Sequence, residues 1–319
     1  MPKPSLPRLA ALAAAAALTL TACGGEAPEP AAADSGLAEV TVADAADDVT
    51  TPAVSFEPGS ITVEESEARV ITAGEGAELG GSELLSFDYA IFSAETAKEV
   101  SSSYPTEPVG LDLSDDSVLP GLTASLTGQT VGSRVLLALP PEDAFGEEGN
   151  TQLGIEANET VLFLVDIISA VTPLTEATGA PVEPQPGLPT VEVTPGEPAT
   201  ITIPEGFAAP ASTVVQPLIA GEGAEVAAGQ TVRVSYTGAT TRDGTVFDSS
   251  AGTPTGFAEF PIGVGRVIQG WDKGLVGQKV GSRVLLVIPA AEGYGDAGSP
   301  PDIQGGDTLV FVVDILAAY

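Results

Sequence analysis

Apolar residues alternate with polar ones, or run without a break, through several short stretches in the second half of the chain. Stretches of β-branched and aromatic residues bounded by Gly, Pro and Asp predict β-strands. Four such strands are expected, at 231–238, 246–248, 283–288 and 309–316. The stretch 283–288 is nearly continuous in Val, Leu and Ile, so we expect this strand to be buried.

Only one segment of this half has apolar residues at helical spacing, 268–276. It holds the single tryptophan of the chain, Trp271, beside Gly270 and close to Gly274, although glycine is a poor helix residue. A short helix with small residues on one side and a large ring on the other predicts the floor of a pocket. The pattern therefore indicates a sheet of four to six strands wrapped over one short helix.

The first half repeats this pattern. The sequence of residues 73–78 recurs at 220–225, that of 131–137 at 280–286, and that of 160–167 closely at 308–315. The paired segments lie 147, 149 and 148 residues apart. Such a constant spacing over about 95 residues indicates two copies of one domain.

Composition divides the chain into five parts. We expect a signal peptide at 1–22, a disordered acidic tether at 23–51 and a first domain at 52–172. A Pro-rich linker at 173–195 should be extended and semi-rigid, and the second domain follows at 196–319. Domains of this size are large enough to fold without cross-links.

The N-terminus predicts export. Lys3 and Arg8 precede a continuous apolar run at 9–20, which is too short for a membrane span of about 20 residues and is typical of a secretory signal. The segment 20–23, ending in Cys23, resembles the lipobox of bacterial lipoproteins. This resemblance implies cleavage before Cys23, lipidation of Cys23 and an extracytoplasmic protein anchored to the membrane by lipid. The alternative is an ordinary signal peptide with an incidental cysteine.

Charge and residue usage exclude several classes of function. The chain has 44 acidic and 11 basic residues, a net charge of -33, one cysteine and no histidine. This surface argues against nucleic acid as a partner. The missing histidine excludes a Ser-His or Cys-His hydrolase and, with one cysteine, a transition-metal site. We expect no cofactor, and we interpret Lys273, Lys279 and Arg283 as solvated positions.

Five segments of the second domain, 234–238, 243–250, 267–271, 293–295 and 309–311, resemble FKBP-type peptidyl-prolyl cis-trans isomerases in order and spacing. The resemblance covers residues 218–319 without a long insertion. It implies an α+β fold with two tandem FKBP-like domains, each an antiparallel β-sheet wrapped around one short α-helix. This agrees with the architecture that the apolar pattern predicts.

The resemblance also implies the site. The pocket would have Trp271 as its floor, Asp248 as the one acidic group near the substrate carbonyl, and the Ile268 N–H as a donor to the bound peptide. The catalytic residues carried over from the family are Tyr236, Phe247, Asp248, Val267, Ile268, Trp271, Tyr294 and Phe311. Two rim positions depart from the family: Ala258 stands where an aromatic residue is usual, and Asp302 where an aliphatic residue is common. Proline-containing exported polypeptides and FK506-like macrolides are the implied partners.

Such a pocket needs no nucleophile or metal. Rotation about a peptide bond has a barrier of about 18–20 kcal/mol because resonance is lost when the amide twists. The twisted amide has less charge separation, so an apolar pocket favours it over the planar form. The absence of histidine is therefore compatible with this activity.

The first domain keeps the scaffold and loses the pocket. Aligned on the shared motifs, Tyr89, Leu119 and Phe163 match Tyr236, Ile268 and Phe311, whereas Val100-Ser101, Leu122 and Phe145 replace Phe247-Asp248, Trp271 and Tyr294. We predict a degenerate domain that has lost or strongly weakened its isomerase site, and whose retained apolar groove could still bind unfolded or proline-containing chains. The main hypothesis is a prolyl isomerase that assists folding of exported proteins through its second domain. The alternative is a non-catalytic chaperone or adaptor that binds proline-containing segments.

Overall fold

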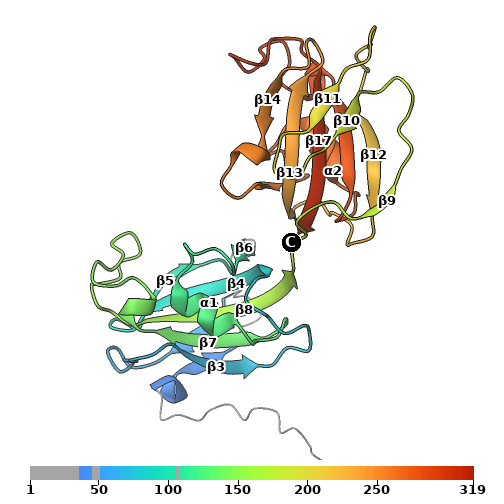
Figure 1. Cartoon of the computed structure of the whole chain (residues 1–319). Helices are drawn as coiled ribbons and strands as arrows, with labels where there is room; N and C mark the ends of the chain where they lie inside the picture. The colour runs from blue at the N-terminus through green and yellow to red at the C-terminus, as the bar shows by residue number, and fades with distance from the viewer. Residues whose placement is uncertain (1–35, 45–50, 105, 107) are drawn as a thin grey trace, which may run out of the picture. The chain divides into compact units, whose positions relative to one another are not determined.

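The computed structural model describes residues 36–44, 51–104, 106 and 108–319, and it contains two tandem domains (Figure 1). Each domain has one large curved antiparallel sheet, one two-stranded antiparallel sheet and one short α-helix. The predicted α+β architecture is confirmed. The expected signal peptide and Cys23 lie outside the described residues.

The first domain extends from Gly36 to Val171. Its elements are η1 (Gly36–Glu39), β1 (Thr41–Ala43), β2 (Ala53–Ser55), β3 (Glu67–Thr72), β4 (Leu84–Ser93), β5 (Glu99–Ser102), β6 (Val109–Asp112), α1 (Pro120–Leu126), β7 (Arg134–Leu139), η2 (Pro141–Asp143) and β8 (Val161–Val171). The main sheet has the strand order β3-β7-β8-β4-β5, and β6 also pairs with β4.

The second domain repeats this layout. Its elements are β9 (Gly179–Pro181), β10 (Thr190–Glu192), β11 (Thr200–Thr202), β12 (Val214–Gly221), β13 (Thr231–Thr240), β14 (Val246–Ser249), η3 (Ser250–Gly252), β15 (Ala258–Pro261), α2 (Gln269–Leu275), β16 (Arg283–Ile288), η4 (Ala290–Glu292) and β17 (Leu309–Ala318). The strand order β14-β13-β17-β16-β12-β9, with β15 on β13, reproduces that of the first domain and adds β9 at the edge. All four predicted strands are confirmed, with ends extended by up to two residues.

The helix α2 lies against the concave face of its sheet because two of its residues are glycines. A Cβ added at Gly270 would be 2.5 Å from Ile288 Cγ2, and one added at Gly274 would be 2.6 Å from Leu286 Cδ2. Both contacts are far inside van der Waals separation. The glycines thus let the helix approach β16 closely, and Trp271 is directed into the core beside them, where it is buried.

Each sheet is buried on both faces. The concave face forms the core around the helix, which in the second domain includes Val232, Val234, Leu275, Leu286 and Phe311. A second apolar core lies on the outer face of each main sheet, under a two-stranded hairpin from the N-terminal part of the same domain. In Figure 1 the hairpin β10–β11 crosses β13 and β17 on the face opposite to α2.

These hairpins correct two predictions. Part of the segment expected to be a disordered tether, 36–43, forms η1 and β1, because Leu37 and Val40 are buried on the outer face of the first sheet. The expected linker 173–195 is extended, but it belongs to the second domain. Its strand β9 pairs with β12, and Val191 of β10 packs into the outer core with Ile201 of β11.

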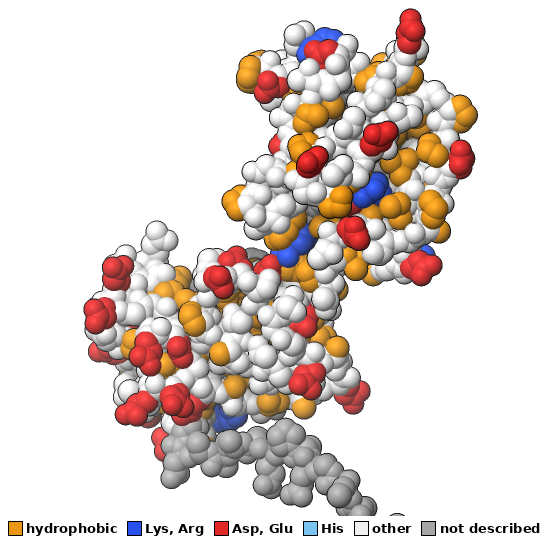
Figure 2. All heavy atoms as spheres, viewed as in Figure 1, with side chains coloured by type: hydrophobic (Ala, Val, Ile, Leu, Met, Phe, Trp, Pro, Cys, Tyr) orange, Lys and Arg blue, Asp and Glu red, His pale blue; other side chains and the backbone are white. Residues whose placement is uncertain are grey.

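The surface carries the charge that composition predicts. Figure 2 shows carboxylate side chains scattered over both domains, with few basic side chains between them. The two α-helices have seven residues each, and in the described part of the chain no helix has the length and apolarity of a membrane span.

Candidate active site

A cavity of about 420 Å³ lies between α2 and the concave face of the second sheet. We call it the inner cavity. Six aromatic side chains, two charged ones and two aliphatic ones line it: Tyr236, Phe247, Asp248, Phe260, Arg266, Val267, Ile268, Trp271, Tyr294 and Phe311. All eight residues predicted for the pocket are therefore brought together, although they come from five separate stretches of sequence.

Trp271 is the centre of the aromatic wall. Its ring meets those of Tyr236, Phe260 and Phe311 edge to face, with centroids 5.4, 5.2 and 5.3 Å apart. This is the arrangement that the quadrupoles of aromatic rings favour. Only 4% of Trp271 is exposed, so its ring is a fixed floor of the cavity.

The single carboxylate of the inner cavity is held by a phenol. The Tyr236 hydroxyl donates to Asp248 Oδ2 at 2.6 Å, a short charge-assisted hydrogen bond. Burial and this negative charge both raise the pKa of Tyr236. Tyr236 thus stays protonated at neutral pH and orients the carboxylate. No proton transfer follows from this geometry.

Ile268 supplies a free backbone donor at the entrance to α2. It is the N-cap residue, with φ -61° and ψ 147°, and its C=O accepts from the Trp271 N–H at 2.9 Å. Its own N–H donates to no acceptor among the described residues. A polypeptide bound in the inner cavity has this donor available.

Gly238 makes room for the aromatic wall. It lies opposite Phe311 in the ladder of β13 and β17. A Cβ at this position would be 2.7 Å from Phe311 Cε1 and 2.8 Å from Phe247 Cζ. The rings of Phe247 and Phe311 meet edge to face at 5.5 Å over this gap. Glycine is thus required for both rings to line the cavity.

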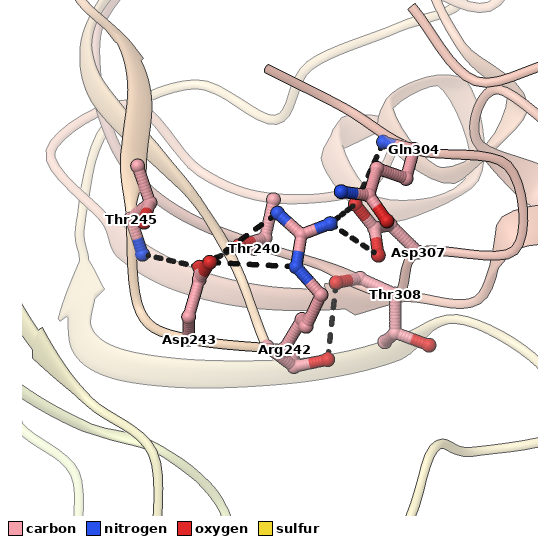
Figure 3. Close-up of polar contacts among 8 residues, drawn as sticks. Thr240, Arg242, Asp243, Thr245, Gln304, Asp307 and Thr308 are labelled. Atoms are coloured by element: carbon pink, nitrogen blue, oxygen red, sulfur yellow. Dashed lines mark hydrogen bonds and ion pairs between the residues drawn. The ribbon is translucent and has the colours of Figure 1, made fainter. Parts of the chain in front are cut away.

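The rim loop that carries Tyr294 is tied to the scaffold at both ends. At one end, Glu292 accepts from Lys273 Nζ at 2.8 Å and from Thr213, contacts that hold its pKa at about 2. At the other end, Arg242 bridges Asp243 and Asp307, with 3.0 Å from Nη1 to Asp307 Oδ2 (Figure 3). Lys273 is exposed as predicted, yet it is paired. Tyr294 itself is 40% exposed at the rim.

A sequence profile described as FKBP-type peptidyl-prolyl cis-trans isomerase matches residues 77–168 and 222–316. The chain belongs to this family. The two matched ranges contain both α-helices and most strands of the two main sheets, whereas the edge strands β3, β9 and β12 and the hairpins on the outer faces lie outside them. In the described part of the chain, no three His, Cys, Asp or Glu side chains are placed to hold a metal ion.

Curated relatives carry the same family name. The chain is 53% identical over 89 residues to the peptidyl-prolyl cis-trans isomerase FKBP15-2 of Arabidopsis thaliana, covering 28% of this chain and 53% of that protein. It is 44% identical over 111 residues to an FK506-binding protein of Streptomyces anulatus, covering 34% of this chain and 87% of that protein. It is 49% identical over 88 residues to human FKBP2, covering 28% and 61%. The chain thus spans about half the length of the plant relative.

Three residues of the second FKBP domain escaped the sequence prediction. Phe260 and Arg266 line the inner cavity, and Gly238 shapes it. The alternation of Ala258, Glu259 and Phe260 in β15 contains the signal for Phe260, since the phenylalanine faces the core side. Phe257, beside the atypical Ala258, is not part of the wall and lies under the guanidinium of Arg233 at 3.9 Å.

The first FKBP domain has the same frame with a different filling. Tyr89 lies opposite Val165 as Tyr236 lies opposite Val313, and its hydroxyl is 3.2 Å from Ser101 Oγ, the counterpart of Asp248. Leu122 is buried in the place of Trp271. At these two positions the first domain therefore has Ser101 instead of a carboxylate and Leu122 instead of the aromatic floor, as predicted.

Proposed function

We propose that the second FKBP domain catalyses cis-trans isomerisation of prolyl bonds in the inner cavity. The observation that carries this proposal is the joint placement of six aromatic rings, one oriented carboxylate and one free backbone N–H around a single cavity. Membership of the isomerase family and the names of the curated relatives support it.

The residues act by binding the twisted amide more tightly than the planar one. The rings of Trp271, Phe247 and Phe311 exclude water from the prolyl ring and the rotating bond, which favours the form with less charge separation. The Ile268 N–H holds the flanking backbone, and Asp248 faces the rotating carbonyl. Prolyl bonds are suited to this mechanism because their cis and trans forms differ by only about 0.5–1 kcal/mol.

We further propose that the protein is lipid-anchored at Cys23 outside the cytoplasm and assists folding of exported proteins there. The motif at 20–23 and the apolar run before it support the anchor. Each buried methylene of a lipid contributes about 0.8 kcal/mol, so two or three chains hold the protein firmly. Proline-containing exported chains are the proposed clients, and FK506-like macrolides the proposed small ligands of the inner cavity.

The experiment for catalysis uses the full chain. Phe247→Val with Asp248→Ser gives the second domain the residues that the first has at these positions. The expected result is loss of turnover on a short X-Pro peptide, with an unchanged fold by circular dichroism. The matched control, Val100→Ala in the first domain, should leave turnover intact. A wild-type chain that binds the peptide without turnover would favour the chaperone hypothesis instead.

The anchor has its own experiment. Wild-type protein expressed in a bacterium with lipoprotein processing should fractionate with membranes, and Cys23→Ser should be released or remain as an uncleaved precursor. Equal solubility of the two exported forms would exclude lipidation. This outcome would not affect the isomerase proposal.

A further inference from the structure

The second FKBP domain has another cavity, of about 600 Å³, on the face of its sheet opposite to α2. We call it the outer cavity. It lies between the sheet and the turn of the hairpin β10–β11, and its walls include Glu197, Thr237, Ala251, Arg283 and Asp314. The inner cavity is on the other side of the same strands, so the isomerase proposal does not account for this space.

The first domain shows what occupies the equivalent position. The Tyr236 N–H donates to Ser250 Oγ and the Tyr89 N–H to Ser103 Oγ, both at 3.0 Å. The next residue also makes one contact in both domains. The Ala251 N–H donates to Ser249 Oγ at 3.3 Å, and the Tyr104 N–H donates to Ser102 Oγ at 3.3 Å. Ala251 is therefore the structural counterpart of Tyr104.

Tyr104 fills its position in the first domain. Its ring packs against the outer core, and its hydroxyl is buried. Burial and the nearby carboxylate of Asp166 raise its pKa. Asp166 forms a two-pronged ion pair with Arg134, with both contacts at 2.7 Å. A phenol ring beside an arginine-aspartate pair is thus a packing solution that this fold already uses.

The second domain keeps the ion pair and lacks the ring. Arg283 Nε and Nη2 donate to Asp314 at 2.6 and 2.7 Å, so Arg283 is not the solvated position that we expected from the sequence. Ala251 leaves the ring position open. In the first domain Asp44 accepts from Arg134 Nη1 at 2.8 Å, whereas Arg283 Nη1 has no acceptor among the described residues. An unused donor therefore borders the open space.

We propose that the outer cavity binds a phenol ring from another molecule, in the position that Tyr104 fills in the first domain. The hydroxyl would lie beside Arg283 Nη1 and Asp314, and the ring would cover Ala251 and Val312. The cavity volume is within the range of about 300–1,000 Å³ of small-molecule sites. The ring comes from a tyrosine of a polypeptide or from a free small phenol, which share this chemistry.

The experiment titrates the full chain with two probes by NMR. One is N-acetyl-tyrosinamide, and the other is an Ala-Ala-Tyr-Ala-Ala peptide without proline, so that the isomerase mechanism is not engaged. Saturable shifts at the amides of Ala251, Thr237 and Glu197 are expected. Binding of both probes would show that the phenol ring is sufficient for recognition. Binding of only the peptide would show that the ligand is a tyrosine within a polypeptide, and binding of only N-acetyl-tyrosinamide would show that it is a free small phenol. Saturation by neither probe would overturn the proposal.

Two variants fix the location. Ala251→Tyr supplies the ring from the chain itself and should weaken binding at least about tenfold, which corresponds to 1.4 kcal/mol. Tyr104→Ala opens the equivalent space in the first domain and should add a second site with shifts around Ser103, as an engineered apolar cavity binds a ring that fits it. The phenylalanine analogues of both probes should bind more weakly, since they lack the hydroxyl. Unaltered binding in Ala251→Tyr would place the ring elsewhere and contradict the proposal.

Discussion

The two FKBP domains share the same sheet and helix but differ in the side chains that pack between them. On the strand that carries the shared tyrosine, Ile91 of the first domain stands where the second has Gly238, and each lies opposite the shared phenylalanine of the neighbouring strand. Ile91 is buried, whereas Gly238 leaves the gap that Phe247 and Phe311 share. The side chain of Ile91 therefore occupies space beside the shared phenylalanine of the first domain, whereas Gly238 leaves the corresponding space of the second domain to two aromatic rings.

A second exchange lies four residues earlier on the same strand, at Phe87. Phe87 of the first domain is buried next to Tyr89, with ring centroids 5.9 Å apart, and its counterpart in the second domain is Val234. The first domain thus combines a large residue on the strand with Leu122 on the helix, and the second combines Val234 with Trp271. Both pairs fill a core, but only the second places a broad ring at the base of a cavity.

The largest effect is expected from removing that ring. Trp271→Ala should cost about 3–5 kcal/mol of unfolding free energy, as for other buried aromatic residues, and should abolish most prolyl isomerase turnover. The matched change in the first domain, Leu122→Ala, should cost about 2–5 kcal/mol and leave turnover intact. Denaturant unfolding and a peptide assay measure the two quantities. Full activity in a folded Trp271→Ala protein would show that this ring is not what distinguishes the second domain from the first.

The next effect tests the gap at Gly238. Gly238→Ala puts a methyl group against Phe247 and Phe311, and overpacking of this kind costs about 1–3 kcal/mol. Because the displaced rings belong to the inner cavity, turnover should fall by about tenfold or more. Ile91→Val in the first domain, the control, should cost about 0.5–1.5 kcal/mol without a change in turnover. A Gly238→Ala protein with the turnover of the wild type would show that the ring positions are not critical.

A smaller change is expected at the carboxylate. In Asp248→Asn the amide oxygen still accepts from the Tyr236 hydroxyl, so only the charge is lost. Hydrogen bonds to charged groups contribute about 1.5–3 kcal/mol, roughly twice the neutral value, so the loss in turnover should be about tenfold or less. A fall of a thousandfold or more with an unchanged melting curve would indicate proton transfer and contradict the twisted-amide mechanism.

The smallest effect concerns pH. The raised pKa of Tyr236 means that the folded protein holds this proton more tightly than the unfolded chain. Its contribution to stability is complete below the unfolded pKa of about 10 and is lost as the pH rises through the folded value. Turnover measured between about pH 6 and 9 should therefore be flat. A bell-shaped profile in this range would point to an acid-base step.

The sequence revealed the inner cavity well because its residues fall in motifs with fixed spacing. Trp271 between small residues and the Phe247-Asp248 pair predicted the wall and the carboxylate that the fold brings together. Gly238 was not predicted, because the need for glycine there depends on rings from two other strands. A comparison of the two copies contained the signal for Gly238, because the first copy has Ile91 at the equivalent position.

The outer faces were not predictable from composition alone. The segments 36–43 and 173–195 are rich in residues typical of disordered or extended chain, and within them Leu37, Val40, Val42, Leu188 and Val191 pack against the outer cores. These few apolar residues suffice because the outer face of each sheet is itself apolar and needs a cover. Long-range packing of this kind overrides the local signal.

We propose that only the second FKBP domain is catalytic, and turnover by the separated domains is the measurement that tests this proposal. Residues 36–172 and 173–319, each with its own hairpin, are to be assayed on one X-Pro peptide whose uncatalysed isomerisation takes about 10–100 s. We expect the second fragment to accelerate isomerisation, and the folded first fragment not to exceed the uncatalysed rate. Comparable turnover by both fragments would contradict it, because the first has neither the carboxylate nor the aromatic floor.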